Sequence, residues 1–283
     1  DYPGFNMRFM RRVRAALPKT KIIYYVSPQV WAWKPARAAS LAKYVDLLLS
    51  ILPFEEAWYK ERQPQINLVW VGHPMLDRLF VPRGEDRDTD SPSIALLPGS
   101  REKEVQRHLP VMLGAAAIMN ESRRSRFICL APNEEVAALA KSIILDGTGH
   151  TLDVRVRVGY TPTHMSRCEL ALVTSGTATL ECAVAGTPMV VYYHVGPLTY
   201  LPAKFLVKVP YLAMVNLLLN REAVPELIQV RARPEEMARV AKELLSNPSR
   251  MQKQREDLER AIAMLGGPGA SSRAAKEILE LVY

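Results

Sequence analysis

The sequence predicts an α/β protein made of two Rossmann-like halves, each with a parallel sheet and helices on both faces. Three observations predict this class. Short apolar runs alternate with stretches of helical spacing along most of the 283 residues, as in βαβ units. One stretch rich in Pro, Gly and charge, VPRGEDRDTDSPS (81–93), interrupts the alternation and indicates a linker. Hydrophobic residues make up 48% of the chain, which provides enough material for two cores.

The first half contains strand and helix signals in alternation, including a Pro at a helix start. In order, the sequence predicts a helix over 5–17, a strand over 21–26, an aromatic loop and helix over 27–44, a strand over 46–52, a helix from Pro53 and a strand over 67–71. The chain opens with DYPGFN, without Met and without a preceding strand. We therefore expect a fragment that lacks its natural N-terminus.

The second half repeats the alternation. The sequence predicts strands over 94–98, 126–131, 151–158, 169–174 and 188–193, with helices between them that include one from Arg101, one over 134–145 and one after Ser175. From Leu198 onward the pattern predicts only helices, with stops at Pro225, Pro234, Pro248 and the GGPG segment 266–269.

These elements predict the domain organisation. We expect the remainder of a first Rossmann-like domain over 1–82, a linker over 83–93, a second Rossmann-like domain over 94–266 and a C-terminal helix over 267–283, with packing of that helix on the first domain as one option. Ligands bind beyond the carboxyl ends of the strands in open parallel sheets. The site is therefore expected in the cleft between the two halves.

Composition limits the partners. The net charge of +8 and the pI near 9.4 suit nucleic acid, anionic lipid headgroups or phosphorylated small molecules. No nucleic-acid-binding motif accompanies the charge, so no nucleic acid partner is predicted. The three cysteines form no CxxC pair, which favours a reducing compartment over a disulfide framework or a zinc site. No apolar run is long enough to span a bilayer.

The segment IALLPGSREKEV (94–105) is the first candidate site. Pro98 and Gly99 make a tight turn after a strand, and Ser100 is expected to cap the following helix. A plain cap is preferred over a capping box because Lys103 holds the third position after Ser100. A helix N-terminus beside Arg101 suits a diphosphate. The alternative is an ordinary βα turn with a surface arginine.

The segment VTSGTATLECAVAGTPMVV (173–191) is the second candidate site. A strand stops at Ser175, Gly176 and Thr177, whose N–H groups are expected to face a ligand. Glu181 lies about a turn and a half into the helix and could accept hydrogen bonds from a ribose diol. The alternative is an acid that merely favours a helix N-terminus. Two such turns in one half favour the nucleotide interpretation.

Other features carry less weight. DRDTD (86–90) lacks the Gly and Glu of a calcium loop, the five histidines have no ligand spacing, and no metal site is predicted. His73 suits a cleft or a structural turn, and Trp31 with Trp33 suits core packing or a sugar contact. The stretch 203–219 suits a core helix or, with its lysines, a membrane-facing patch.

Six motifs carry a family resemblance: YVSPQVWAWKPAR, LPFEEAWY, VGHPMLD, LLPGSREKEV, SGTATLECAVAGTPMVV and VNLLLNREAVPELIQ. In this order they resemble the lipid-A-disaccharide synthases, a family of bacterial glycosyltransferases. The resemblance implies a GT-B fold, with the acceptor on the first domain and the UDP-sugar on the second. It implies inverting transfer of 2,3-diacylglucosamine from its UDP derivative to 2,3-diacylglucosamine 1-phosphate. The family's glycine-rich N-terminal segment has no counterpart here.

The resemblance also implies roles for residues. Gly99, Ser100 and Arg101 would hold the diphosphate, and Ser175, Gly176 and Thr177 would add N–H groups. Glu181 would contact the ribose, with Asn216 and Gln229 near the donor. The family's proposed general base falls on Asp1.

Further expectations concern cofactors, partners and location. No cofactor is implied, and helix N-termini with Arg101 could stabilise the leaving UDP without a divalent metal. A peripheral position on the cytoplasmic face of the inner membrane and a possible homodimer are expected. The enzyme alternatives are a UDP-N-acetylglucosamine epimerase or a peptidoglycan-pathway transferase. A non-catalytic UDP-binding or membrane-associating module is the alternative from another class.

Overall fold

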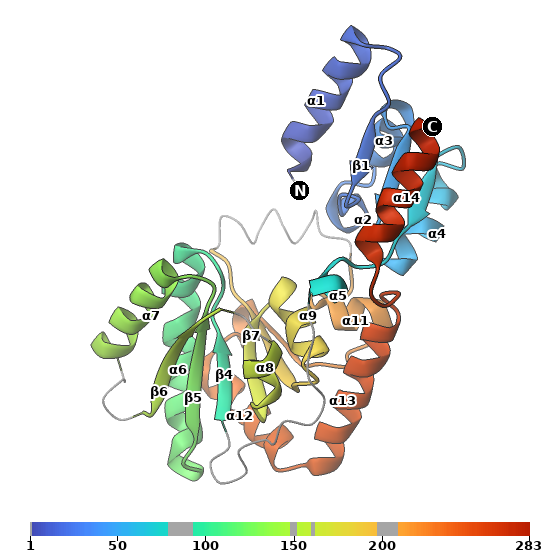
Figure 1. The fold of residues 1–283 in the computed structure, drawn as a ribbon. Coiled ribbons are helices and arrows are strands. Elements are labelled where there is room, and N and C mark those ends of the chain that lie inside the picture. Colours follow the sequence, from blue (N-terminus) through green and yellow to red (C-terminus); the bar gives the residue numbers. More distant parts are fainter. Residues whose placement is uncertain (1, 79–92, 148–151, 160–161, 197–208) are drawn as a thin grey trace. The chain divides into compact units, whose positions relative to one another are not determined.

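The computed structural model describes residues 2–78, 93–147, 152–159, 162–196 and 209–283 (Figure 1). These residues form two compact units. Unit 1 consists of the described residues of Asp1–Arg78, Leu198–Val209 and Ala263–Tyr283, and unit 2 of those of Leu79–Pro197 and Pro210–Ile262. No helix among the described residues is long and apolar enough to cross a bilayer.

Unit 1 has a three-stranded parallel sheet in the order β1-β2-β3. Its strands are β1 (Ile23–Tyr25), β2 (Leu47–Ser50) and β3 (Leu68–Trp70). Its helices up to residue 78 are α1 (Pro3–Ala16), α2 (Val30–Trp33), α3 (Arg37–Tyr44), α4 (Pro53–Arg62) and α5 (Met75–Arg78). Alternate residues of a strand face opposite sides of a sheet. Leu48 accordingly packs in one apolar cluster with Leu41 and Tyr59, whereas Leu47 and Leu49 pack in a second.

The second cluster of unit 1 is completed by α14 (Ala270–Val282), which follows all of unit 2 in the chain. Ala274, Ile278 and Leu281 of this helix pack against Leu47, Leu49 and Val71. Asp77 caps the helix, because its carboxylate accepts the N–H groups of Gly269, Ala270 and Ser271 at 2.6, 3.0 and 2.8 Å. These backbone donations hold the pKa of Asp77 down, at about 2.

Unit 2 has a six-stranded, wholly parallel sheet in the order β6-β5-β4-β7-β8-β9. Its strands are β4 (Ser93–Leu97), β5 (Arg126–Ala131), β6 (Val154–Val158), β7 (Leu170–Thr174), β8 (Met189–Tyr193) and β9 (Glu226–Ile228). Its helices are α6 (Glu102–Ser122), α7 (Glu134–Asp146), α8 (Pro162–Ser166), α9 (Thr177–Val184), α11 (Met214–Leu219), a 3-10 turn (Gln229–Arg231), α12 (Pro234–Leu245) and α13 (Pro248–Ala263). Central strands are buried on both faces, which explains their continuous apolar runs.

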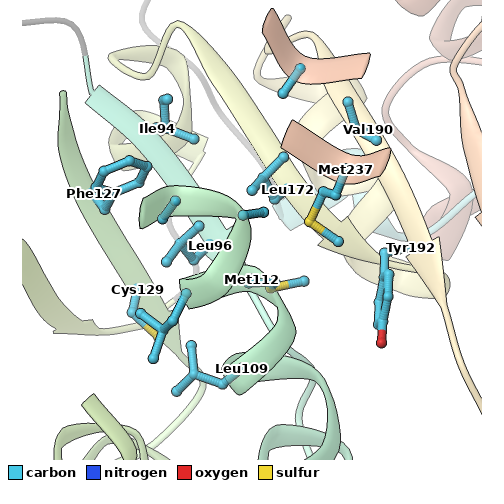
Figure 2. Packing of buried hydrophobic residues seen from close by; sticks show 14 of the residues in the cluster. Ile94, Leu96, Leu109, Met112, Phe127, Cys129, Leu172, Val190, Tyr192 and Met237 are labelled. Atoms are coloured by element: carbon cyan, nitrogen blue, oxygen red, sulfur yellow. The ribbon is translucent and has the colours of Figure 1, made fainter. Parts of the chain in front are cut away.

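A large apolar cluster of unit 2 lies between this sheet and helices α6, α7 and α12. Figure 2 shows Leu109 and Met112 of α6 and Met237 of α12 against residues of the central strands. Leu96 and Leu172 of β4 and β7 are fully buried in the same cluster. Burial of each such side chain contributes about 1.5–3 kcal/mol to stability. The packing fixes β4 and β7, whose carboxyl ends carry the two candidate turns.

The structure corrects one of the predicted secondary-structure assignments, and two predicted segments lie outside the described residues. The region after Leu198 is not wholly helical, because Glu226–Ile228 forms strand β9 and pairs with β8 through Val191 and Glu226. A three-residue strand after Pro225 has too few residues for an alternating pattern, and only the neighbouring strand defines it. The predicted linker 83–93, apart from Ser93, and the DRDTD stretch lie outside the described residues.

Candidate functional site

The two candidate turns leave neighbouring strands of unit 2 at the same edge of the sheet. Strands β4 and β7 are parallel and paired, with Leu97 opposite Val173 (Figure 1). The hydroxyl of Thr174 donates to the carbonyl of Leu97 at 3.2 Å. The turn at Gly99 and the turn at Gly176 therefore begin side by side at the carboxyl edge of one sheet, where ligands of parallel sheets bind.

The Gly176 turn is open to a ligand. Gly176 has a φ of 144°, a conformation that favours glycine, and a Cβ built there meets no atom within 4 Å among the described residues. No acceptor for the N–H groups of Gly176 and Thr177 is found in the described part of the chain. The N–H of Ser175, by contrast, donates to the carbonyl of Tyr192 at 3.1 Å. Ser175 therefore does not offer the amide that the sequence assigned to it.

Glu181 has a carboxylate oxygen that lacks a partner. Its Oε2 is buried, and no hydrogen-bond partner is found for it among the described residues. Burial raises the pKa of this carboxyl group. A desolvated acceptor without a donor is costly in a protein that binds nothing there. The placement is consistent with the predicted contact to a ligand hydroxyl.

The Gly99 turn is closed by a side chain of its own helix. The helix α6 has Arg101, not Ser100, at its N-cap position, so the predicted Ser100 cap is wrong. The carboxylate of Glu104 instead accepts the N–H groups of Ser100 and Arg101 at 3.1 and 3.3 Å. A Cβ on Gly99 would lie 2.7 Å from Oε2 of Glu104, which explains why glycine is needed there.

Closure of the Gly99 turn by Glu104 determines which groups of the turn can bind an anion. The guanidinium of Arg101 pairs with Glu104 at 3.0 Å, yet its side chain is 82% exposed. The N–H groups of Ser100 and Arg101 are already occupied by a carboxylate. A diphosphate could use these two amides only if the Glu104 side chain moved away. The Arg101 side chain could reach an anion without that change.

His108, which no sequence motif indicated, connects the Gly99 turn to the segment that follows β8. Its ring is buried and edge-on to Tyr192, with 5.2 Å between ring centroids. Nδ1 lies 3.0 Å from the carbonyl of Pro98, and Nε2 lies 3.0 Å from the carbonyl of His194. His108 therefore ties the end of β4 to the end of β8. A lone histidine within an apolar helix gives no such signal in a sequence.

The buried Glu226 supports the Gly176 turn indirectly, through the segment that precedes α11. The carboxylate of Glu226 accepts the N–H groups of Leu212 and Ala213 at 3.0 and 2.9 Å and the side-chain amide of Asn216 at 2.8 Å. The hydroxyl of Ser175 donates to the carbonyl of Leu212 at 3.1 Å. Glu226 thus fixes the start of α11, and Leu212 connects that start to the Gly176 turn. No motif in the sequence pointed to Glu226.

Asn216 and Gln229 lie in this region but bond to the protein itself. Asn216 is fully buried, and its Oδ1 accepts the N–H groups of Ala223 and Val224 at 2.7 and 2.9 Å. Gln229 accepts the N–H of Val195 at 2.7 Å and donates to its carbonyl at 3.1 Å. In this arrangement both side chains position backbone, and a direct substrate contact by either stays a prediction.

The remaining candidates fall in or near unit 1. Asp1 lies outside the described residues. His73 accepts the N–H of Met75 at 3.2 Å, as a structural turn residue would, and burial lowers its pKa. Trp31 is buried and donates to Glu55 at 2.9 Å, which fits packing under the loop. The described residues contain no cluster of three or more potential metal ligands.

The stretch 203–219 is only partly described. Residues 203–208, with both of its lysines, lie outside the described residues. In the described part, Ala213, Val215 and Leu218 are buried. The α11 portion of this stretch therefore contributes to a core, as the default interpretation expected.

A family model and individual relatives all assign the chain to the same family. The model of a family described as "Lipid-A-disaccharide synthetase" matches residues 1–281. The lipid-A-disaccharide synthase of Syntrophus aciditrophicus is 38% identical over 298 residues, covering 100% of this chain and 74% of the relative. Those of Anaeromyxobacter dehalogenans and Persephonella marina are 38% and 33% identical, covering 99% of this chain and 73% and 76% of the relatives.

Solved structures resemble the chain in fold. The Staphylococcus aureus MnaA–UDP co-structure has a TM-score of 0.61 at 11% identity, covering 99% of this chain and 80% of that one. The Neisseria meningitidis UDP-GlcNAc 2-epimerase bound to UDP-GlcNAc has a TM-score of 0.59 at 14% identity, covering 92% and 69%. Acinetobacter baumannii MurG has a TM-score of 0.51 at 14% identity, covering 97% and 76%. These likenesses confirm the predicted α/β fold of GT-B type.

Proposed function

The chain belongs to the lipid-A-disaccharide synthase family, and from this premise we propose that it is an inverting glycosyltransferase of lipid A biosynthesis. It transfers 2,3-diacylglucosamine from UDP-2,3-diacylglucosamine to 2,3-diacylglucosamine 1-phosphate. The products are lipid A disaccharide 1-phosphate and UDP. The observation that carries the proposal is the 33–38% identity to named synthases along the whole chain, since the solved UDP-GlcNAc 2-epimerase and MnaA share only the fold, at 14% and 11% identity.

The donor nucleotide binds at the Gly176 turn in this proposal. The N–H groups of Gly176 and Thr177 donate to the diphosphate, at the positive end of the α9 dipole. The carboxylate of Glu181 accepts from the ribose hydroxyls, which would give its unpartnered oxygen a donor. Ser175 supports the turn through Leu212 rather than through its own amide.

The Gly99 turn supplies charge to the leaving group. The exposed guanidinium of Arg101 binds a phosphate oxygen of the departing UDP. Ser100 and Arg101 offer their N–H groups to the diphosphate only after Glu104 has moved. Preorganised donors that meet developing negative charge lower the barrier without needing a proton.

The chemical step exchanges one bond for another at the anomeric carbon. The primary hydroxyl oxygen of the acceptor forms a bond to C1 of the donor sugar as the bond from C1 to the UDP oxygen breaks, which inverts C1. The hydroxyl proton passes to a carboxylate, and Asp1 is the proposed general base by family resemblance. Asn216, Gln229 and Glu226 are assigned positioning roles because they hold the segments that surround the donor.

A transfer assay with matched donors tests this function. Purified chain is incubated with the phosphorylated acceptor and either UDP-2,3-diacylglucosamine or unacylated UDP-glucosamine, and products are identified by mass spectrometry. Disaccharide 1-phosphate should form from the acylated donor alone. Epimerised UDP-sugar as the product would contradict the proposal. An increased melting temperature with UDP but no disaccharide would instead indicate a non-catalytic UDP-binding module.

We also propose that the protein associates peripherally with the cytoplasmic face of the inner membrane, where its acylated substrates reside. Helix α1 exposes Phe5 and Phe9, whose ring centroids lie 5.7 Å apart, close in sequence to the exposed Arg8 and Arg12. Apolar and basic side chains together suit an anionic lipid surface. Flotation with phosphatidylglycerol vesicles should weaken in a Phe5→Ser/Phe9→Ser variant. Unchanged flotation would contradict this role for α1.

A further inference from the structure

Two cations lie against one indole ring after strand β1 of unit 1. Nζ of Lys34 is 4.4 Å from the centroid of the Trp33 ring, and Cζ of Arg37 is 5.1 Å from it. Neither cation has a carboxylate within ion-pair distance in the described part of the chain. The three side chains are half-buried. Both positive charges are therefore held at one ring, which attracts them without neutralising them.

A buried polar network fixes the loop that carries these residues. The hydroxyl of Ser27 donates to the hydroxyl of Tyr59 at 3.1 Å, and Tyr59 donates to the carbonyl of Pro28 at 3.2 Å. Trp31 donates to Oε1 of Glu55 at 2.9 Å, and Oε2 of Glu55 accepts from the N–H of Leu52 at 3.2 Å. Each hydrogen bond between fixed partners restricts the loop.

The network and the backbone are costly features for an ordinary loop. Burial raises the pKa of Glu55 to about 7, although the Trp31 and Leu52 donors act against the rise. Val26, at the start of the loop, has a φ of 66°, which is an outlier for a β-branched residue. Strained backbone of this kind clusters at functional sites.

The loop leaves the edge of the sheet at which ligands bind. Strand β1 ends at Tyr25, and the loop follows at once, so its residues start from the carboxyl edge of the three-stranded sheet. A second cluster of the same chemistry starts from the opposite edge. There, Arg11 and Lys43 lie 5.7 and 5.4 Å from the Tyr44 ring, just before β2 begins. This second cluster provides a matched control.

We propose that Lys34 and Arg37 form the subsite for the phosphate of the acceptor glycolipid, with Trp33 as the residue that positions both cations. The inference rests on the proposed function, which supplies a phosphate monoester as one of the two substrates. Two uncompensated cations held at one indole ring match the charge of a phosphate monoester, and Arg37 can donate two hydrogen bonds to it. The buried network keeps the two cations in place before the acceptor binds.

Direct binding measurements on the full chain test the subsite. The probes are 2,3-diacylglucosamine 1-phosphate and the same lipid without phosphate, both in detergent. The wild type should prefer the phosphorylated lipid by about 10- to 100-fold, the range expected for charge-assisted hydrogen bonds. The Lys34→Gln/Arg37→Gln variant should lose this preference and keep its UDP affinity. In the transfer assay its acceptor KM should rise by a similar factor while the donor KM stays unchanged.

Matched variants distinguish a phosphate subsite from a general effect of positive charge on unit 1. The Arg11→Gln/Lys43→Gln variant should keep the full preference for the phosphorylated lipid. Trp33→Leu should lose part of the preference, and Trp33→Phe should restore it, because a phenyl ring also holds cations. A preference retained by Lys34→Gln/Arg37→Gln, or lost equally in Arg11→Gln/Lys43→Gln, would overturn the proposal.

Two outcomes identify what fails. If Lys34→Gln/Arg37→Gln weakens binding to phosphatidylglycerol vesicles but leaves acceptor binding in detergent intact, the cations serve a lipid surface and the subsite is overturned. If the wild type prefers the phosphorylated lipid but forms no disaccharide, the transfer function fails while the subsite is supported.

Discussion

The Gly99 turn and the Gly176 turn differ although they share an edge of one sheet and a similar sequence. Each follows an apolar strand, contains a glycine with positive φ and leads into a helix. In the first turn, Glu104 occupies the N–H groups of Ser100 and Arg101. In the second, the amides of Gly176 and Thr177 have no acceptor among the described residues.

The position of one acid explains the difference. Glu104 is the third residue of its helix, from which a carboxylate reaches back to the N-cap amides. In α9 that position is Thr179, and the acid comes two residues later at Glu181, too far along the helix to close the turn. The comparison teaches that a strand, a glycine and a helix start do not alone define an anion site. The side chain at the third helical position decides whether the amides are available.

Removal of the Glu181 carboxylate should produce the largest effect on nucleotide binding. Glu181→Ala is expected to weaken UDP binding by about 10- to 100-fold, because hydrogen bonds to a charged acceptor contribute about 1.5–3 kcal/mol. Isothermal titration with UDP measures the change. Glu135→Ala, at an exposed acid in the first turn of α7, is the control and should bind as the wild type does. Equal affinity in the Glu181→Ala protein would remove the ribose contact from the proposal.

A smaller loss of UDP affinity is expected when Glu226, which supports the Gly176 turn indirectly, is changed. Glu226→Gln leaves one side-chain acceptor where the carboxylate now serves Leu212, Ala213 and Asn216. The free energy of unfolding should fall by about 2 kcal/mol. UDP binding should weaken by about fivefold, or 1 kcal/mol. Urea denaturation and UDP titration measure the two effects, with Glu256→Gln on the exposed side of α13 as control. A loss of stability without loss of UDP affinity would separate Glu226 from the turn.

Removal of the side chain that closes the Gly99 turn should increase UDP affinity, by a still smaller factor. Glu104→Ala frees the N–H groups of Ser100 and Arg101 and is expected to tighten UDP binding by about threefold, or 0.6 kcal/mol. The same change should lower the free energy of unfolding by about 1 kcal/mol, because the helix loses its cap. Glu102→Ala, in the same first turn, is the control. Weaker UDP binding in Glu104→Ala would show that Glu104 assists the nucleotide.

The smallest change in UDP affinity is expected near neutral pH, from the protonation of Glu181. Burial raises the pKa of its carboxyl group, so protonation begins at a higher pH than for an exposed glutamate. UDP affinity should fall as the pH falls, and it should fall less in Glu181→Gln. Without UDP the sign reverses, because the folded state holds this proton more tightly than the unfolded state does, and the contribution of Glu181 to stability grows at lower pH. UDP titrations and denaturation curves from pH 7 to pH 5 measure both slopes; identical slopes in the variant would contradict a titrating role for Glu181.

The sequence predicted most of the fold because long apolar strands leave a strong pattern. Strands such as Leu170–Thr174 are fully buried and read as continuous apolar runs. Strand β9 was not predicted, because three residues are too few to show an alternation of apolar and polar side chains. Gly99 and Gly176 were placed correctly in turns at the carboxyl edge of the sheet, since turns between strand and helix are locally encoded.

Contacts between distant segments were not predictable. His108 bonds to His194, 86 residues away, and Glu226 bonds to Leu212 and Asn216 across the start of α11. Ser100 was expected to cap a helix from Arg101 because its hydroxyl suits that position, yet the helix begins one residue later, at Glu102, and Glu104 accepts the amides at its start. These outcomes depend on tertiary geometry and on small differences between competing caps, which local patterns do not contain.

The docking of α14 has a consequence for the order in which the protein folds during synthesis. The apolar cluster around Leu47, Leu49 and Val71 lacks Ala274, Ile278 and Leu281 until nearly all of this chain has left the ribosome. Unit 2 is translated before that moment, and the described residues of the apolar cluster around Leu96 all belong to unit 2. Unit 2 can therefore reach its native packing first, whereas unit 1, although synthesised earlier, keeps an apolar face exposed until α14 has been synthesised.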